Sequence, residues 1–306
     1  MSSANGGSLA PKILCAGIIV LDEVFQVERF PESGEKAHAH HFFTVNGGCA
    51  ANAAIAVARL GGRAALAGPL GDDRNGDQVL AALARERVDC TGCQRLAGTV
   101  TPLSAIFIDS RGERMIATHH DDHLAAAVPA DPAALVACVD AVLADNRLPQ
   151  FVRPICLAAR ARDLTVVLDA DRPTQMCDDL FRIATHVVFS GECLRATTGL
   201  HELDAALASI AAVTPSFVAV TDGERDVLWH EDGTLRRTPV FPVKAVDTLA
   251  AGDVFHGAFT LALAEGCNTA AAIQFAAAAA SLKCARLGGS AAAPQRPEVE
   301  ALLARS

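Results

Sequence analysis

Residues 247–253 read D-T-L-A-A-G-D and combine two carboxylates with three small residues at the start of a predicted helix. From Val254 onward, apolar residues recur at helical spacing. The N-terminus of a helix presents unpaired N–H groups and a partial positive charge, so it can bind a phosphate group. A carboxylate there would repel that phosphate, but as a base it could take a proton from a hydroxyl that attacks phosphorus. Asp253 suits this role, although the segment taken alone is better explained by an N-cap aspartate on an ordinary helix.

A second motif lies near the N-terminal end of the chain. Residues 46–52 read N-G-G-C-A-A-N and precede a predicted helix, which ends at L-G-G in residues 60–62. Both motifs resemble signatures of the ribokinase-like (PfkB) carbohydrate kinases, in the order in which the family has them. The usual C-terminal pattern is D-T-x-G-A-G-D, so Ala250 stands where the family has glycine. Because the two motifs lie far apart, the resemblance covers nearly the whole chain.

The resemblance implies a fold and a reaction. The fold would be an α/β, ribokinase-like three-layer sandwich with a mainly parallel central sheet and a small β-sheet lid. The reaction would transfer the γ-phosphoryl group of ATP to a sugar hydroxyl. Asp253 would be the general base, and the N–H groups of Ala250, Ala251 and Gly252 would stabilise the transferring phosphoryl group. Mg²⁺ would arrive with the phosphates of ATP.

The periodicity of the chain agrees with such a fold. Residues 13–21 are a continuous apolar run, typical of a strand that is buried on both faces of a parallel sheet. Strands and helices then alternate, which predicts helices on both faces of that sheet. No composition change marks a boundary, so we expect one domain over residues 1–306. The other predicted elements are a helix that ends at Arg59, a strand at 64–67, a helix at 77–87, strands at 139–144, 164–168, 186–189 and 217–221, helices at 149–161, 174–182 and 202–212, an antiparallel pair at 226–231 and 235–241 with its turn at Asp232-Gly233, and two helices from the 247–253 motif onward, the second capped by Asn268 or Thr269.

Two more polar segments are predicted to form the lid. Residues 24–45 have extended character, and residues 101–118 form a hairpin with its turn at 110–112. In the family, segments at these places form a small sheet over the sugar site and often pair with a second subunit. The resemblance therefore implies a homodimer through the lid, which would also cover exposed strand edges.

The predicted sugar-binding residues lie at the end of the apolar run at residues 13–21 and in the motif at residues 46–52. Asp22, Gly48 and Asn52 match positions that hold substrate hydroxyls in the family. Asp22 would end an apolar strand, where a carboxylate must find partners or water, and a turn aspartate is the alternative. Gly47 and Gly48 would let a substrate approach the backbone, which any strand-to-helix turn also requires.

The nucleotide side departs from the family pattern at two places. Asp226 replaces the second glycine of a T-x-G-x-x-G loop, and residues 190–193 read S-G-E-C where the family often has N-x-x-E to organise metal-bound water. Whether a monovalent cation lies beside residues 247–248 stays open. The alanine-rich face of residues 276–280, with Cys284 and residues 288–289, fits the wall of an adenine slot, and close packing of small residues is the alternative. The nucleotide contacts that the resemblance implies are Thr221, Gly223, Thr248, Cys284 and Gly288.

Three further strings are G-D-V-F-H-G-A at residues 252–258, L-K-C at 282–284 with Arg286 and residues 288–289, and V-L-A-D at 142–145. They resemble the sulfofructose kinase branch of the family. There, a lysine of the first lid segment and an arginine after a Leu-Ala-Asp strand end hold the sulfonate, and Lys36 and Arg147 match them. Thr118 stands at a third contact, which is asparagine in that branch. The alternatives are a solvated Lys36 and an ion pair of Arg147 with Asp145 or Asp171. The resemblance thus favours the C1 hydroxyl of a ketose with an anionic C6 group, sulfofructose first and fructose 6-phosphate second.

Other functions stay open at this point. Within the family, a phosphofructokinase, fructokinase, ketohexokinase or nucleoside kinase is possible. A non-catalytic sugar- or nucleotide-binding protein belongs to another class. The intact Asp253 with its small-residue loop argues against that class, whereas the altered residues 190–193 argue for it.

Composition excludes several partners. A net charge of −9 argues against nucleic acid. Of ten cysteines, only Cys90 and Cys93 form a C-x-x-C, so no zinc site is predicted, and the others suit small buried side chains in a reducing compartment. The first eleven residues lack signal-peptide features, and no apolar run suits a membrane span. We therefore expect a cytoplasmic protein.

Two groups of histidines invite a metal-site interpretation. His38, His40 and His41 lie in the first lid segment, and residues 119–123 read H-H-D-D-H. Neither spacing matches a known ligand motif, so no dedicated protein metal site is predicted. Contact of lid histidines with substrate is the better functional hypothesis.

Overall fold

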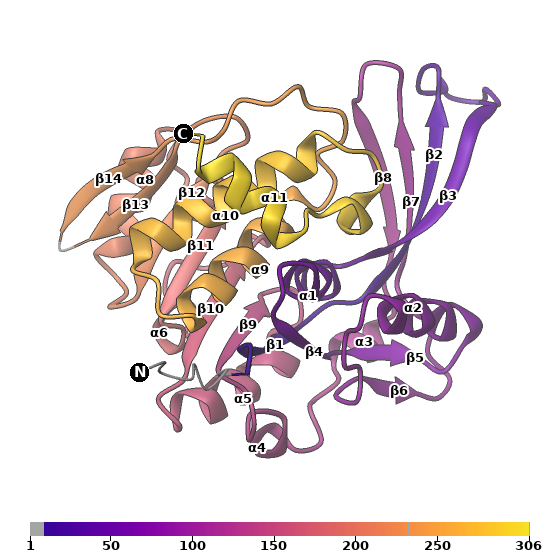
Figure 1. The fold of residues 1–306 in the computed structure, drawn as a ribbon. Coiled ribbons are helices and arrows are strands. Elements are labelled where there is room, and N and C mark those ends of the chain that lie inside the picture. Colours follow the sequence, from indigo (N-terminus) through magenta and orange to yellow (C-terminus); the bar gives the residue numbers. More distant parts are fainter. Residues whose placement is uncertain (1–8, 232, 306) are drawn as a thin grey trace, which may run out of the picture.

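The computed structural model describes residues 9–231 and 233–305. In this part of the chain, a central sheet of eight strands has the order β14-β13-β12-β11-β10-β9-β1-β4 (Figure 1). Neighbours from β4 to β12 run parallel, and β13 and β14 extend the edge as antiparallel strands. The strands are β1 (Lys12–Ala16), β4 (Arg63–Ala67), β9 (Ala141–Asp145), β10 (Thr165–Ala170), β11 (His186–Ser190), β12 (Phe217–Thr221), β13 (Val227–Glu231) and β14 (Thr234–Thr238).

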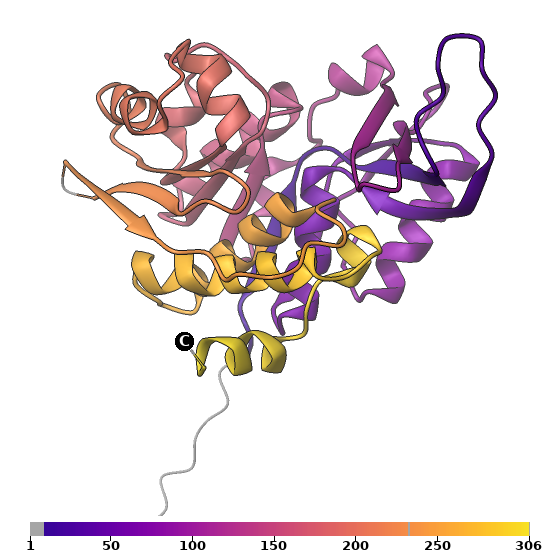
Figure 2. The ribbon, with the colours of Figure 1, turned by 90° about the horizontal axis from the view of Figure 1, so that it is seen from above.

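Alternate residues of these strands face two layers of helices. Ile13 and Cys15 of β1 belong to a core cluster with α1, α9 and α10, whereas Leu14 and Ala16 belong to a cluster with α5 and α8. Burial on both faces is typical of parallel strands. The three-layer α/β sandwich expected from the sequence is therefore confirmed (Figure 2). The helices are α1 (Cys49–Arg59), α2 (Arg74–Arg85), α3 (Asp122–Ala125), α4 (Pro132–Leu135), α5 (Pro149–Arg160), α6 (Leu180–Ile183), α7 (Gly191–Thr198), α8 (Leu203–Ala211), α9 (Ala251–Ala264), α10 (Thr269–Cys284), α11 (Arg296–Leu303) and the short 3₁₀ helix η1 (Gly289–Ala292).

A second sheet projects from one side of the sandwich as the lid (Figure 1). It has the strand order β3-β2-β7-β8, and it joins the two segments that the sequence assigns to the lid. Strands β2 and β7 pair in parallel, and the other pairs are antiparallel. The lid strands are β2 (Val20–Val27), β3 (Ala39–Gly47), β7 (Leu103–Ile108) and β8 (Arg114–His119), and a separate small sheet pairs β5 (Pro69–Gly71) with β6 (Gln94–Leu96).

The single strand predicted at residues 13–21 is wrong. The apolar run breaks at Gly17, and the chain passes from β1 in the central sheet to β2 in the lid. A Cβ at Gly17 would lie 1.9 Å from Asp145 Oδ2, and that same oxygen accepts a hydrogen bond from the Ile18 N–H at 2.7 Å. A buried carboxylate thus turns the chain between the two sheets. As a consequence, Asp22 lies within a lid strand and does not end a core strand.

Several smaller expectations also change. The helix predicted at 174–182 is only α6, and α7, β5 and β6 were not predicted. Asn268 caps α10, since its side chain accepts from the Ala271 N–H at 2.9 Å. Residues 1–8 and Asp232 lie outside the described residues. Within those described, no helix combines the length and the apolar composition of a membrane span. Some cysteines are exposed where the sequence suggested burial, namely Cys138, Cys177 and Cys267.

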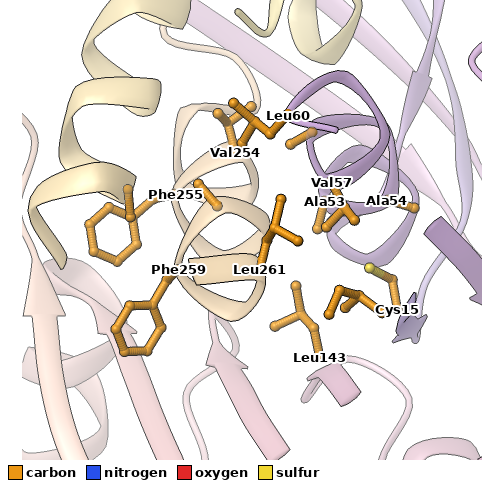
Figure 3. Packing of buried hydrophobic residues seen from close by; sticks show 14 of the residues in the cluster. Cys15, Ala53, Ala54, Val57, Leu60, Leu143, Val254, Phe255, Phe259 and Leu261 are labelled. Atoms are coloured by element: carbon orange, nitrogen blue, oxygen red, sulfur yellow. The ribbon is translucent and has the colours of Figure 1, made fainter. Parts of the chain in front are cut away.

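Helices α1 and α9 pack closely in one layer of the sandwich (Figure 3). Gly257 permits this approach, because a Cβ there would lie 2.7 Å from the Ala53 carbonyl oxygen. Val57 and Leu261 are fully buried in the same cluster. Close packing leaves little freedom for one helix to shift along the other. The start of α9 is thereby held against α1.

Candidate active site

Helix α9 begins with an unusual backbone. Ala250 at its N-cap has φ 64°, a left-handed conformation that disfavours a residue with a Cβ. The N–H of Ala251 donates to the Thr248 carbonyl at 3.2 Å, so it takes part in the turn that leads into α9. The N–H groups of Ala250, Gly252 and Asp253 have no acceptor within the described residues. These three donors make the first turn of α9 a site for an anion.

Asp253 is the third residue of α9, so the N-cap alternative is wrong. Asn52, the fourth residue of α1, donates from Nδ2 to Asp253 Oδ2 at 2.7 Å. Asn52 is only 4% exposed, and its Oδ1 has no hydrogen-bond partner among the described residues. A buried acceptor without a partner is costly. The amide thus leaves one acceptor available to a hydroxyl beside the carboxylate of Asp253.

The electrostatics around Asp253 favour a proton near neutral pH. Burial, followed by the charges of Asp171 and Asp145, raises the pKa of Asp253 to about 7, against the hydrogen bond from Asn52, which lowers it. A carboxylate with such a pKa can both accept and release a proton in the physiological range. This geometry suits a general base.

Asp253 belongs to a cluster of carboxylates at the carboxyl ends of β9 and β10. Asp145 ends β9, Asp169 lies near the end of β10, and Asp171 follows it. One ligand atom each of Cys49, Asp169 and Asp253 lie within 4.8 Å of one another. Carboxylate oxygens suit a hard cation such as Mg²⁺, whereas a thiol does not. Asp169 therefore fits the metal that ATP carries, which leaves Asp253 free as the base, and the sequence analysis did not identify Asp169.

The pKa values of this cluster follow from burial and mutual repulsion. Burial first, then the charge of Asp171, raise the pKa of Asp169 well above its ordinary value. Burial also raises the pKa of Asp145 to about 6 and, together with the charge of Asp253, raises that of the Cys49 thiol. Bringing a cation into the cluster would relieve the repulsion among the carboxylates.

His256 holds the first turn of α9 to the sheet. Its Nδ1 lies 2.7 Å from the Gly252 carbonyl oxygen, and its Nε2 lies 3.3 Å from the Val188 carbonyl oxygen of β11. Asp169 Oδ2 lies 3.5 Å from Nδ1. The side chain is buried. Its position three residues after Asp253 was the available sequence signal, and the sequence analysis did not use it.

The predicted sugar-binding residues lie around Asp22. A Cβ at Gly47 would lie 2.2 Å from Asp22 Oδ2, so the glycine leaves room for the carboxylate. Burial raises the pKa of Asp22 to about 6, against a hydrogen bond from Ser104 that lowers it. Ser104 also pairs with Thr118 across β7 and β8, with 3.2 Å between the hydroxyl oxygens. Gly48 has φ 88°, and its Cβ would lie 2.4 Å from the Ile18 carbonyl oxygen, so packing requires this glycine.

Arg147 takes the ion pair that the sequence left as an alternative. Its Nε donates to Asp171 Oδ2 at 3.0 Å, and its Nη2 contacts the same oxygen. Despite burial, which acts to lower it, the pKa of Arg147 is raised by Asp171. Burial, and then the charge of Arg147, lower the pKa of His120, and Arg172 adds a smaller effect of the same sign. Arg147, Arg172 and His120 thus lie near one another, and we call these three residues the basic cluster; the lowered pKa leaves His120 uncharged near neutral pH.

Lys36 lies apart from these contacts. It is exposed in the connection between β2 and β3, which extends outward from the lid (Figure 2). No hydrogen bond or ion pair of its side chain occurs within residues 9–231 and 233–305. The histidines of the lid are exposed too, and His40 pairs with Glu28 at 3.6 Å.

Several of the predicted nucleotide-binding residues lie around Asp247. Its carboxylate accepts from the N–H groups of Leu249, Gly288 and Gly289, at 2.8, 3.1 and 3.0 Å. Its own N–H donates to the Cys284 carbonyl at 3.1 Å. Three of the residues predicted to contact ATP, Thr248, Cys284 and Gly288, thus lie beside this carboxylate or bond to it.

Two further predicted nucleotide residues lie at the end of β12. Thr221 ends that strand and is partly buried, and Gly223 has φ 63° in the turn that follows. The left-handed φ explains the glycine without any ligand. Ser190, where the family has asparagine, caps α7 by accepting from the Cys193 N–H at 3.2 Å.

Comparison with known proteins decides the family. A model described as pfkB family carbohydrate kinase matches residues 10–296. The chain belongs to this family. The kinase is 28% identical over 298 residues to the ribokinase of Bacillus subtilis, across 95% of this chain and 99% of the relative.

Solved structures agree with this kinase in fold. A candidate ribokinase from Agrobacterium tumefaciens has a TM-score of 0.93 at 38% identity, covering 97% of this chain and 98% of that one. The ribokinase of Arabidopsis thaliana, solved with ribose and ATP, has a TM-score of 0.83 at 25% identity, covering 96% and 99%. Together with the family match, these relatives identify the protein as an ATP-dependent carbohydrate kinase.

Proposed function

We propose that this kinase phosphorylates the C1 hydroxyl of a ketose that carries an anionic group at C6. The observation that carries the phosphoryl transfer is the position of Asp253, whose pKa is raised to about 7 beside three N–H groups of the first turn of α9 that have no acceptor among the described residues. Phosphoryl transfer depends mainly on positioning and on neutralising charge, which this turn can provide.

Each site residue has a separate role in the proposed phosphoryl transfer. Asn52 Oδ1 and Asp22 accept hydrogen bonds from sugar hydroxyls, and Asp253 takes the proton as the hydroxyl oxygen attacks the γ-phosphorus. The new O–P bond forms as the bond to the β-phosphate oxygen breaks, and ADP leaves. The N–H groups of Gly252 and Asp253 stabilise the equatorial oxygens of the transferring group. Mg²⁺, held near Asp169, would neutralise charge on the phosphates.

The basic cluster supports an anionic group on the sugar. Arg147 follows the end of β9, and Arg172 Nη1 donates to the Arg147 carbonyl oxygen at 3.5 Å. Both arginines lie near enough to His120 to lower its pKa. A guanidinium group suits the tetrahedral oxygens of a sulfonate or phosphate. Sulfofructose is the first candidate and fructose 6-phosphate the second. Thr118 and Lys36 belong to this proposal through the resemblance to the sulfofructose kinase branch.

A neutral sugar is the second candidate function. Asp171 already neutralises Arg147, and acidic side chains dominate the rest of the site. Relatives of this chain include ribokinases. Ribose or another neutral furanose would need only the acceptors at Asp22 and Asn52.

A coupled assay of ADP release distinguishes the two candidates. The panel contains sulfofructose, fructose 6-phosphate, fructose, ribose and a nucleoside. We expect kcat/KM to be highest for an anionic ketose. Highest kcat/KM for ribose or fructose would reject the anionic substrate, and absence of ADP release with every compound would reject this set of substrates altogether.

The lid sheet supports a homodimer as a further part of the proposal. Phe42, Met115 and Ile116 on the edge strands β3 and β8 are 55%, 42% and 51% exposed. Large exposed apolar side chains on strand edges favour pairing with another chain. We expect a dimer in light scattering and a monomer after Ile116→Lys. A monomeric wild type would reject the dimer.

A further inference from the structure

A fully buried lysine lies behind the first turn of α9. Lys283, near the end of α10, is 0% exposed. Its Nζ donates to the Asp247 main-chain carbonyl oxygen at 2.7 Å and lies 2.9 Å from Asp247 Oδ2. A buried ammonium group is costly unless oxygens surround it. The two oxygens of Asp247 supply such partners, so the positive charge of Lys283 has a specific place in the structure.

The charge lies where three segments of the chain meet. Asp247 opens the loop that leads to Ala250 and α9, and its carboxylate also binds the N–H groups of Gly288 and Gly289. The N–H groups of Val246 and Asp247 donate to the Cys284 carbonyl at 2.8 and 3.1 Å. Lys283 therefore neutralises a carboxylate that connects the loop before α9 with the end of α10 and with residues 288–289.

A carbonyl oxygen and a carboxylate oxygen that converge on one point form a site for a monovalent cation. Such oxygens can coordinate K⁺, and NH₄⁺ donates hydrogen bonds to them as the ammonium group of lysine does. We propose that the Lys283 ammonium is a built-in monovalent cation, which positions the loop before α9 and its phosphoryl-binding N–H groups and makes the kinase independent of added K⁺. Lys283 is a positioning residue, because it touches Asp247 and not the reacting atoms.

Two variants separate loss of charge from loss of volume. Lys283→Ala removes the charge and leaves a space beside both oxygens of Asp247, whereas Lys283→Met removes the charge and fills much of that space. Lys244→Met, at an exposed lysine in the preceding segment, is the control. We expect both Lys283 variants to lose kcat by about 10²-fold, the typical cost of a displacement of about 1 Å, with little change in the KM for sugar.

Rescue by cations tests the proposal directly. Turnover is measured in KCl, NH₄Cl and tetramethylammonium chloride at equal ionic strength. We expect wild type and Lys244→Met to be equally active in all three salts. Lys283→Ala should recover at least roughly tenfold in NH₄Cl or KCl, a tenfold change being 1.4 kcal/mol, and Lys283→Met should recover much less.

The turnover measurement rests on the proposed sugar substrate. Thermal unfolding needs no substrate, so it tests the role of Lys283 independently of that proposal. We expect the Tm of Lys283→Ala to rise in NH₄Cl or KCl over its value in tetramethylammonium chloride, and the Tm of Lys244→Met to show no such difference. Activation of the wild type by K⁺ would overturn the proposal. So would a Lys283→Ala protein whose Tm and turnover respond to no cation, or one as active as wild type in tetramethylammonium chloride.

Discussion

Asn52 and Asp253 lie 201 positions apart in the chain, yet the Asn52 amide donates to the Asp253 carboxylate at 2.7 Å. The close contact of α1 with α9 places them together. The bond supplies one hydrogen-bond donor to a carboxylate whose pKa burial raises to about 7. The proton affinity of the proposed base is therefore controlled from a distant part of the chain.

Asp253→Asn should lower kcat by about 10²–10⁴-fold, the usual contribution of a general base, because an amide cannot take the proton from the hydroxyl. The protein should still fold. Asp163→Asn, at an exposed carboxylate between α5 and β10, is the control and should keep full activity. An Asp253→Asn protein with wild-type kcat would remove Asp253 from its proposed role.

The pH dependence of kcat/KM should follow the proton on Asp253. The base acts when deprotonated, so activity should rise as the pH passes through about 7. Asn52 stabilises the charged carboxylate, so Asn52→Ala should move the midpoint to higher pH. A midpoint that stays in place or moves to lower pH would contradict the assignment.

Asp169→Asn should stabilise the protein at high pH. Burial raises the pKa of Asp169 in the folded state, so its contribution to stability is fully present below the ordinary pKa of 3.8 and is lost as the pH rises through the raised value. The variant cannot ionise. Urea unfolding should therefore show a larger gain over wild type at pH 8 than at pH 6, and exposed Glu224→Gln should show no such difference. A gain that is greater at pH 6 would refute this account.

Ala250→Gly should stabilise the protein or leave its stability unchanged. Alanine in the left-handed conformation costs about 1–2 kcal/mol, and the greater freedom of glycine in the unfolded chain offsets about 0.4–1 kcal/mol of that gain. The control is Ala208→Gly on the exposed face of α8, which should cost about 1 kcal/mol. Equal destabilisation by both changes, measured as Tm or as unfolding free energy, would argue against strain at Ala250.

Arg147→Ala should weaken binding of an anionic sugar by about 1.5–3 kcal/mol, the range for a hydrogen bond to a charged group. Neutral ketoses should be almost unaffected. KM and kcat for fructose and sulfofructose provide the comparison. Equal losses on both would show that Arg147 acts through its ion pair with Asp171, and the anionic substrate would be rejected with it.

The amino-acid sequence by itself determined the family, the alternation of strands and helices, and Asp253 as the proposed base. These features depend on local patterns, namely apolar periodicity and two short motifs whose residues are neighbours in the chain. The hairpin of the second lid segment was also predictable, because its turn residues lie between two extended runs.

Only the tertiary structure decided which distant residues meet. An apolar run does not reveal that Gly17 breaks it, because the cause is the Asp145 carboxylate of another strand. The contacts of Asn52 with Asp253 and of Lys283 with Asp247 likewise depend on helix packing, which no local pattern encodes. Burial, pKa and partner choice are properties of the surroundings in space, so they become visible only when the chain is folded.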